Sequence, residues 1–241
     1  MDEALLSLSG VVTHIGAYHI LHGVDLTVRA GRVTMLLGRN GAGKTTTLRT
    51  IMGLWKPRHG AIRFDGAEIG GNETPDIARR GIAYVPETMG IFSQLTVAEN
   101  MRLAATGSRF DEARLADVFR FFPILKTKWH DRAGLMSGGQ KQMLAVARAI
   151  VEERRLMIID EPTKGLAPSV IDQLIECFRE QKARGTTILL VEQNFHMARS
   201  VGDDVAVMDN GRVIHAGAMA ELAGDEALQT RLLGLSLDSH Q

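Results

Sequence analysis

The sequence predicts an α/β fold: a mostly parallel sheet with crossover helices, a small β layer in front, and an inserted helical subdomain. Three observations support this prediction. Residues 32–54 begin as an apolar strand, cross a glycine-rich loop and continue as a helix. Strand and helix patterns alternate again over residues 156–191, which is typical of parallel strands joined by crossover helices. Between these regions, residues 96–151 show mainly helical periodicity.

The composition is that of a globular domain. The chain has 241 residues, 45% hydrophobic and 23% charged, which is enough for one large buried core. We therefore expect a single domain over residues 1–241, with the helical subdomain at about 88–150. Lys plus Arg and Asp plus Glu each number 28, so the formal net charge is zero and no nucleic-acid partner is expected.

Neither a membrane span nor a secretory signal is expected. No run of about 18 apolar residues occurs, and the amino-terminal segment is acidic rather than basic. Cys177 is the only cysteine and cannot form an internal disulfide, which suits a reducing compartment. A role in a membrane process would therefore be that of a peripheral subunit.

The first predicted elements are mainly strands. Apolar and polar residues alternate over 24–28, as on a half-buried strand, and an apolar run covers 32–37. A helix is expected over 45–54. Two further short strands are expected at 62–64, before an Asp-Gly turn, and at 81–85.

The predicted helical insertion follows. Thr96 and Glu99 have the spacing of a capping box, so a helix is expected to begin there. A second helix is expected to end at Pro123. The third is expected to begin after Ser137 and to bury apolar residues over 144–151.

The last part alternates strand and helix. A strand is expected over 156–159, a helix over 170–178 and a strand over 186–191. Asn210-Gly211 between two apolar runs predicts a tight β-hairpin, and the leucines of 228–233 predict a final helix.

A phosphate-binding loop is predicted between the strand at 32–37 and the helix after it, where the sequence matches G-x-x-x-x-G-K-[ST] at every fixed position. Glycines let backbone amides approach phosphate oxygens, and the helix supplies its positive end. We expect Lys44 to reach the β and γ phosphates as a catalytic residue, and the Thr45 hydroxyl to bind Mg²⁺. The strand before the loop and the helix after it disfavour a chance glycine-rich turn. The expected ATP-binding residues of the loop are Gly38, Arg39, Asn40, Gly41, Ala42, Gly43, Lys44, Thr45 and Thr46.

Two carboxylates end the predicted strand at 156–159. An acid at this place, beside a phosphate loop, can hold Mg²⁺, and we assign that role to Asp160. Glu161 is then expected to be the base that orients and polarises the attacking water. A solvated pair at a strand end is the alternative interpretation, and the upstream phosphate loop favours the functional one.

A third motif, Ser137-Gly138-Gly139-Gln140, looks like a helix start at which two glycines leave backbone amides open to a phosphate. The phosphate loop, Glu87, this motif and the Asp-Glu pair follow one another along the chain in that order. In this order of motifs the chain resembles the ATP-binding-cassette (ABC) ATPases along nearly its whole length. The resemblance implies a P-loop NTPase fold with a RecA-like core, an antiparallel β subdomain and an inserted helical subdomain.

The resemblance also implies a mechanism with two cassettes. Each ATP lies between the phosphate loop of one cassette and the 137–140 motif of the other, so Ser137, Gly138, Gly139 and Gln140 are expected to bind nucleotide in trans. Gly165-Leu166-Ala167-Pro168 stands where the family has a dimer-contact loop. ATP closes the dimer and hydrolysis reopens it, which drives two integral-membrane permease subunits.

Several strings narrow the resemblance to the second ATP-binding subunit (F-type) of branched-chain amino-acid importers. They include Val85-Pro86-Glu87 and Val191-Glu192-Gln193-Asn194. Most cassettes have glutamine at the position of Glu87 and histidine at that of Gln193, whereas this subfamily usually has the residues found here. Glu87 is expected at the metal. Gln193 cannot become cationic, so its expected catalytic role is to orient water or phosphate through neutral hydrogen bonds.

The adenine site departs from the family pattern. Cassettes commonly stack adenine on an aromatic residue, and alignment places Ile15 at that position. An isoleucine buries the base without π-stacking, which weakens adenine binding by on the order of 1 kcal/mol. Tyr18 or His19 could replace the missing ring, although either is more simply a strand or loop residue.

The predicted function is that of an ATP-hydrolysing, Mg²⁺-dependent subunit of an ABC importer for branched-chain or related amino acids. Its expected partners are a second ABC ATPase subunit, two permease subunits and, indirectly, a periplasmic or extracellular solute-binding protein, and its expected location is the cytoplasmic face of the inner (plasma) membrane. A urea or short-amide importer is the alternative within transport. A non-transport cassette ATPase acting on ribosomes or DNA is disfavoured, because such proteins usually have tandem cassettes or a long coiled-coil insertion.

Overall fold

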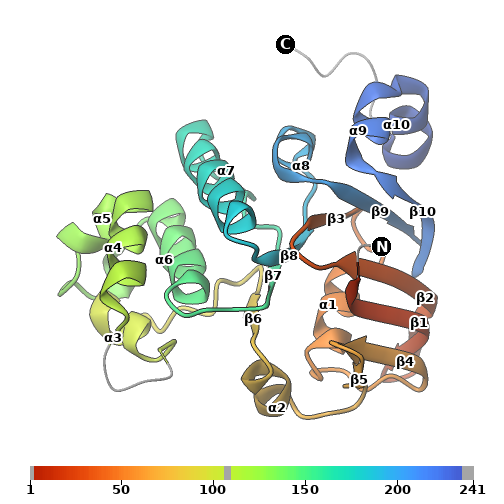
Figure 1. Ribbon diagram of the computed structural model, residues 1–241, viewed down its shortest axis with the longest axis horizontal. Coiled ribbons are helices and arrows are strands. Elements are labelled where there is room, and N and C mark those ends of the chain that lie inside the picture. Colours follow the sequence, from red (N-terminus) through yellow and green to blue (C-terminus); the bar gives the residue numbers. More distant parts are fainter. Residues whose placement is uncertain (1–2, 106–109, 235–241) are drawn as a thin grey trace.

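Two β-sheets form the centre of the protein (Figure 1). The computed structural model describes residues 3–105 and 110–234. The first sheet has four strands in the order β2-β1-β4-β5, all antiparallel to their neighbours. The second has six strands in the order β10-β9-β3-β8-β7-β6. This arrangement confirms the predicted α/β fold with a separate antiparallel layer.

The antiparallel sheet places its apolar residues on one face. Leu6 pairs with Val28 and Leu8 with Leu26, and all four side chains are buried. The alternation predicted over residues 24–28 is therefore confirmed. The strands of this sheet are β1 (Ala4–Ile15), β2 (Tyr18–Arg29), β4 (His59–Phe64) and β5 (Ala67–Glu68).

The larger sheet is parallel except for one edge. β3 lies between β8 and β9, β7 continues the parallel order beyond β8, and β10 returns antiparallel to β9 through the predicted Asn210-Gly211 turn. The carboxyl ends of β3, β8 and β7 therefore lie at the same edge of the sheet. Its strands are β3 (Val33–Gly38), β6 (Ile82–Val85), β7 (Leu156–Asp160), β8 (Thr187–Val191), β9 (Asp204–Asp209) and β10 (Arg212–Ala218).

Helix α1 (Lys44–Ile51) lies between the two sheets, where Leu48 and Ile51 share one core with residues of both. A second core covers the other face of the larger sheet and contains residues of α6 (Gly138–Ile150) and α7 (Pro168–Ala183). The shorter helices are α2 (Thr74–Arg79), α8 (Phe195–Val201), α9 (Met219–Gly224) and α10 (Glu226–Leu233).

Four helices gather on one side of the molecule (Figure 1): α3 (Val97–Arg102), α4 (Glu112–Phe121), α5 (Pro123–Thr127) and α6. The capping box predicted at Thr96 is confirmed, because the Thr96 side chain accepts from the Glu99 amide at 3.1 Å and the Glu99 carboxylate accepts from the Thr96 amide at 2.7 Å. Pro123 ends the run of α4 as predicted and also starts α5, where its missing N–H costs nothing.

Gly211 joins three parts of the fold. Its amide donates to the Ala42 carbonyl at 3.0 Å, and its carbonyl accepts from the His22 amide at 2.9 Å. A Cβ on Gly211 would lie 2.0 Å from the Ile20 carbonyl oxygen, and its φ is +71°. The β9–β10 turn therefore contacts both the antiparallel sheet and the loop before α1, at a distance that only glycine permits.

β1 was not predicted, and β2, β4 and β10 are longer than predicted. Two helices also differ from the prediction. α1 ends at Ile51 rather than at residue 54, because Gly53 takes the left-handed conformation that ends helices. α7 is longer than expected and runs into a polar segment where apolar periodicity gives little signal. None of the helices within the described residues is long and apolar enough to cross a membrane.

The segment between β6 and α3 is held by Asn100, whose side chain is fully buried. Its Oδ1 accepts from the Phe92 amide at 3.0 Å, and its Nδ2 donates to the carbonyls of Phe92 and Thr96 at 3.0 and 2.9 Å. This segment begins just beyond Glu87, so one amide side chain fixes the course of the chain away from that carboxylate.

We expect Asn100→Ala to lower the free energy of unfolding by about 2 kcal/mol, because the Phe92 amide loses its acceptor and a cavity remains. Urea unfolding with the linear extrapolation measures this loss. Leu103→Ala is the control, since Leu103 is 58% exposed at the end of the same helix. Equal losses in the two variants would show that the Asn100 bonds contribute nothing specific.

Candidate active site

The loop between β3 and α1 has a backbone that only glycine adopts easily. Gly38, Gly41 and Gly43 have φ of 144°, 80° and 102°. A Cβ on Gly38 would lie 2.2 Å from the Met208 carbonyl oxygen, so the loop packs directly against β9. Gly43 precedes α1 without any side-chain cap, which leaves the amides of the first turn available to an anion.

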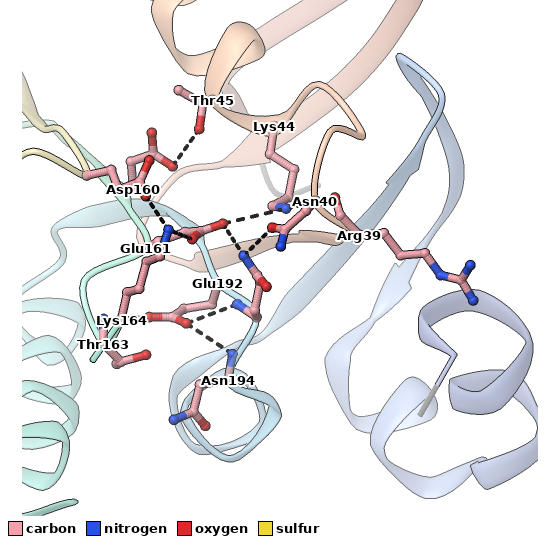
Figure 2. A network of polar contacts seen from close by, with 12 residues as sticks. Arg39, Asn40, Lys44, Thr45, Asp160, Glu161, Thr163, Lys164, Glu192 and Asn194 are labelled. Atoms are coloured by element: carbon pink, nitrogen blue, oxygen red, sulfur yellow. Dashed lines mark hydrogen bonds and ion pairs between the residues drawn. The ribbon is translucent and has the colours of Figure 1, made fainter. Parts of the chain in front are cut away.

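A hollow of about 370 Å³ lies against this loop. It brings together residues that are far apart in the sequence, from the loop, from the end of β6 and from the end of β7. All nine predicted loop residues lie in or beside this region, although Ala42 is buried and the Arg39 side chain points away toward α10 (Figure 2). The hollow is lined by Ile20, Asn40, Gly41, Gly43, Lys44, Thr45, Thr46, Glu87, Glu161 and Lys164.

Lys44 lies at the floor of the site and is only 4% exposed. Its Nζ donates to the carbonyls of Gly38 and Arg39 at 2.8 and 3.1 Å, so the loop curls around the cation. The same Nζ is 3.7 Å from Oε1 of Glu161, and Figure 2 shows the two side chains facing each other. The predicted catalytic lysine and base thus form a buried ion pair.

Thr45 and Asp160 face each other across the site (Figure 2). The Thr45 hydroxyl donates to Oδ1 of Asp160 at 3.2 Å. Asp160 is fully buried, and its Oδ2 has no hydrogen-bond partner among the described residues. Burial, and to a lesser extent the charges of Glu161 and Glu87, raise the pKa of Asp160 to about 6. A hydroxyl and a carboxylate are oxygen ligands of the kind that Mg²⁺ prefers, so these residues fit a magnesium ion.

Glu161 has a strained backbone. Its φ is 47°, a left-handed value that costs a residue with a side chain about 1–3 kcal/mol. The Glu161 amide donates to the Val191 carbonyl at 2.9 Å, which ties the end of β7 to the end of β8. Strain held in this way is common at functional sites, and here it sets the direction of the carboxylate.

Gln193, two residues beyond β8, bonds two parts of the site through one amide nitrogen. Its Nε2 donates to Oε1 of Glu161 at 2.6 Å and to Oδ1 of Asn40 at 2.7 Å. The predicted catalytic glutamine therefore contacts both the predicted base and the phosphate loop. It does so with a neutral donor, as the residue type requires.

Glu87 lines the hollow but contacts a cation that the sequence analysis missed. Its Oε1 is 2.6 Å from Nζ of Lys164, which also lies 3.9 Å from Oε2 of Glu161. Lys164 follows Glu161 by three residues in the loop after β7, and that proximity in sequence was the available signal. Glu87 thus shares the hollow with Thr45, and its carboxylate is bonded to lysine. Asp160 does not line the hollow, although the charge of Glu87 acts on it.

The 137–140 motif stands apart from the hollow and begins α6. Ser137 Oγ accepts from the Gln140 amide at 3.3 Å, and Gln140 Oε1 accepts from the Ser137 amide at 3.1 Å. Ser137 and Gly138 are exposed, and Gly139 lies against Val170 of α7. None of these four residues lines the hollow, so the described part of the chain does not bring them to its own phosphate loop.

The residue predicted to bury adenine also lies outside the hollow. Ile15 ends β1 and pairs with Tyr18 across the β1–β2 turn. Tyr18 is 76% exposed, and His19 stacks on His14 with ring centroids 4.3 Å apart. Ile20, which the sequence analysis did not single out, lines the hollow instead.

Comparison with known proteins gives the family. The family model described as ABC transporter matches residues 21–164, which is more than half of the chain. The chain belongs to the ABC transporter family. It is the nucleotide-binding, ATP-hydrolysing component of that family, in agreement with the site described above.

Similar proteins align over almost the whole of this ABC ATPase. The high-affinity branched-chain amino acid transport ATP-binding protein BraG of Pseudomonas aeruginosa is 38% identical, over 95% of this chain and 100% of its own. The probable branched-chain amino acid transport ATP-binding protein LivF of Archaeoglobus fulgidus is 34% identical, over 90% of this chain and 93% of its own. A solved structure of an ATP binding subunit of an ABC transporter superposes with a TM-score of 0.82 at 36% identity, over 97% of this chain and 96% of its own.

We expect Asp160→Asn to stabilise the ABC ATPase when nucleotide and metal are absent. The folded pKa of about 6 exceeds the unfolded value of about 3.9, so as pH rises through this window the unfolded state loses its proton first. Ionised Asp160 therefore destabilises the fold at neutral pH, by on the order of 2–3 kcal/mol, and contributes nothing below the unfolded pKa.

Chemical unfolding in the presence of a chelator tests this expectation. The free energy of unfolding of the variant should exceed that of the wild type near pH 7.5. This difference should shrink to about half near pH 5. A difference that does not change with pH would contradict the assignment of the effect to the Asp160 charge.

Proposed function

We propose that this ABC ATPase is the energy-coupling subunit of an importer for branched-chain or related amino acids, and that Glu161 is its catalytic base. The observation that carries the catalytic proposal is the position of the Glu161 carboxylate, between Lys44 and Gln193 and in the same hollow as the phosphate loop. The transport proposal is supported by BraG and LivF, whose names refer to branched-chain amino acid transport and which align over nearly the whole chain.

The loop and its lysine bind the triphosphate in this proposal. The amides at the uncapped start of α1 donate hydrogen bonds to phosphate oxygens, and Lys44 adds a fixed positive charge. Thr45 and Asp160 would hold Mg²⁺, with Glu87 nearby in the hollow. When bound, Mg²⁺ neutralises charge on the β and γ phosphates.

Glu161 orients the attacking water and accepts its proton. The strained φ and the bond to Val191 fix the Glu161 backbone. The contacts with Lys44 and Gln193 fix the position of its carboxylate. Positioning of this kind lowers the barrier by removing the need to reorganise charged groups during the reaction. Gln193 remains neutral throughout, so it holds Glu161 and the phosphate region in place without transferring a proton.

A second cassette completes the site in this proposal. The 137–140 motif, of which Ser137 and Gly138 are exposed, presents a helix start with two glycines to the phosphates bound by the partner ATPase. Residues 165–168 contact that partner. Closing and reopening of the ATPase dimer drives two integral-membrane permease subunits, to which a periplasmic or extracellular binding protein delivers the solute. The ATPase itself is peripheral on the cytoplasmic face of the membrane.

We expect Glu161→Gln to lower kcat for ATP hydrolysis by about 10²–10³-fold while leaving ATP affinity within about twofold, because the amide cannot accept the proton of water. Glu176→Gln on the exposed side of α7 is the matched control and should hydrolyse ATP at the wild-type rate. Steady-state phosphate release by the purified protein and a nucleotide-binding titration give the two quantities. Equal kcat in wild type and Glu161→Gln would refute the base assignment.

We expect the transported solute to be identified through the neighbouring reading frames. They should encode two permeases, a second cassette and a solute-binding protein, and the reconstituted assembly should hydrolyse ATP faster when the binding protein carries leucine, isoleucine or valine. Stimulation by urea or a short amide, with none by these amino acids, would replace the proposed solute. Absence of permease frames would count against the importer itself.

A further inference from the structure

Glu192, the residue directly after β8, has a buried carboxylate. Its exposure is 2%, and no Lys or Arg within the described residues pairs with it. Its oxygens accept instead from three backbone amides, those of Thr163 at 3.0 Å, Gln193 at 3.0 Å and Asn194 at 3.1 Å. In Figure 2 the Glu192 carboxylate lies between the segment of Thr163 and that of Asn194. Burying a charge is costly, and only such bonds offset the cost.

The three amides belong to two different loops. Thr163 lies in the loop that follows β7 and contains Glu161 and Lys164, whereas Gln193 and Asn194 start the loop that leads into α8. Oε1 holds the first loop and Oε2 holds the second. One side chain therefore joins the segment of the proposed base to the segment of the proposed orienting glutamine.

We propose that Glu192 is a positioning residue for ATP hydrolysis, which fixes Glu161 relative to Gln193 by bonding the backbones of their two loops. This inference rests on the roles proposed above for Glu161 and Gln193. It extends them to a residue that does not line the hollow of the phosphate loop.

The bonds around Glu161 show how this works. The Glu161 amide is tied to the Val191 carbonyl, and two residues later the Thr163 amide is tied to the Glu192 carboxylate. The left-handed Glu161 lies at one end of this clamped stretch, so its φ of 47° is imposed by bonds on both sides. The second loop is held in the same way, because Asn194 also caps α8 through its side chain, which accepts from the Met197 amide at 3.1 Å.

The chemistry of the contact requires a carboxylate. All three partners are N–H donors, and an ionised carboxylate offers only acceptors. Burial raises the pKa of Glu192, and the bonds from these amides and from the Thr163 side chain act in the opposite direction and favour the charged form. A glutamine of the same shape would direct its NH₂ group at one of the two loops, so that loop would lose its acceptor and move away.

The test compares Glu192→Gln and Glu192→Asp with the exposed control Glu176→Gln. In the purified protein we expect both Glu192 variants to lose kcat by about 10–100-fold, with KM and ATP affinity changed by less than about threefold, since a displacement of about 1 Å can cost that much. The aspartate variant keeps the charge but withdraws the acceptor by one carbon. Hydrogen exchange at the Thr163 and Gln193 amides should speed up in the glutamine variant and remain unchanged in the control.

A double-mutant cycle separates this inference from the roles on which it rests. If Glu192 acts through Glu161, Glu192→Gln should lower kcat little further in a Glu161→Gln background. Wild-type kcat in both Glu192 variants, or a loss that multiplies fully with that of Glu161→Gln, would overturn the inference. So would parallel losses of kcat, ATP affinity and melting temperature, which indicate general unfolding. Wild-type activity of Glu161→Gln would refute the proposed base, and with it the inference that Glu192 acts by positioning that base.

Discussion

The parallel order of β3, β8 and β7 is the constraint on which the site depends. Parallel neighbours end at the same edge of a sheet, so the phosphate loop after β3, Gln193 after β8 and Glu161 after β7 meet there although they are distant in sequence. Asp160 pairs in register with Val191, and the next amide, that of Glu161, donates to the Val191 carbonyl. A shift of one residue in this register would separate the base from the glutamine and turn Asp160 to the other face.

Most of the sheet and the main site residues could be predicted from the sequence. The phosphate loop requires glycines at fixed places, and Asp160 and Glu161 follow an apolar strand, so both leave local patterns. The short helices α2, α8 and α9 were not predicted, because one or two turns are too few to show a period. Lys164 and Ile20 were missed for another reason: their place in the hollow depends on contacts with segments that are distant in sequence. The only local signal was the three-residue spacing between Glu161 and Lys164.

The site stores unfavourable features that the rest of the fold compensates. Asp160 is a buried acid and Glu161 has a left-handed backbone. Among the residues that the structure describes, one Asp160 oxygen has no partner and buried Glu192 pairs with no cation. Each would be better served, for stability alone, by a different residue. Two extensive apolar cores on either side of the larger sheet supply the stability that allows these features to persist.

The Gly211 contact described for the β9–β10 turn has a thermodynamic meaning for ligand binding. It bonds the Ala42 carbonyl, while Gly38 at the start of the same loop packs on the Met208 carbonyl of β9. The loop is therefore shaped by its neighbours before any phosphate arrives, and the entropy of ordering it is lost on folding rather than on binding. Nucleotide affinity then depends on two glycines, one of them far away in sequence, and a substitution in the hairpin turn would weaken binding without touching the ligand.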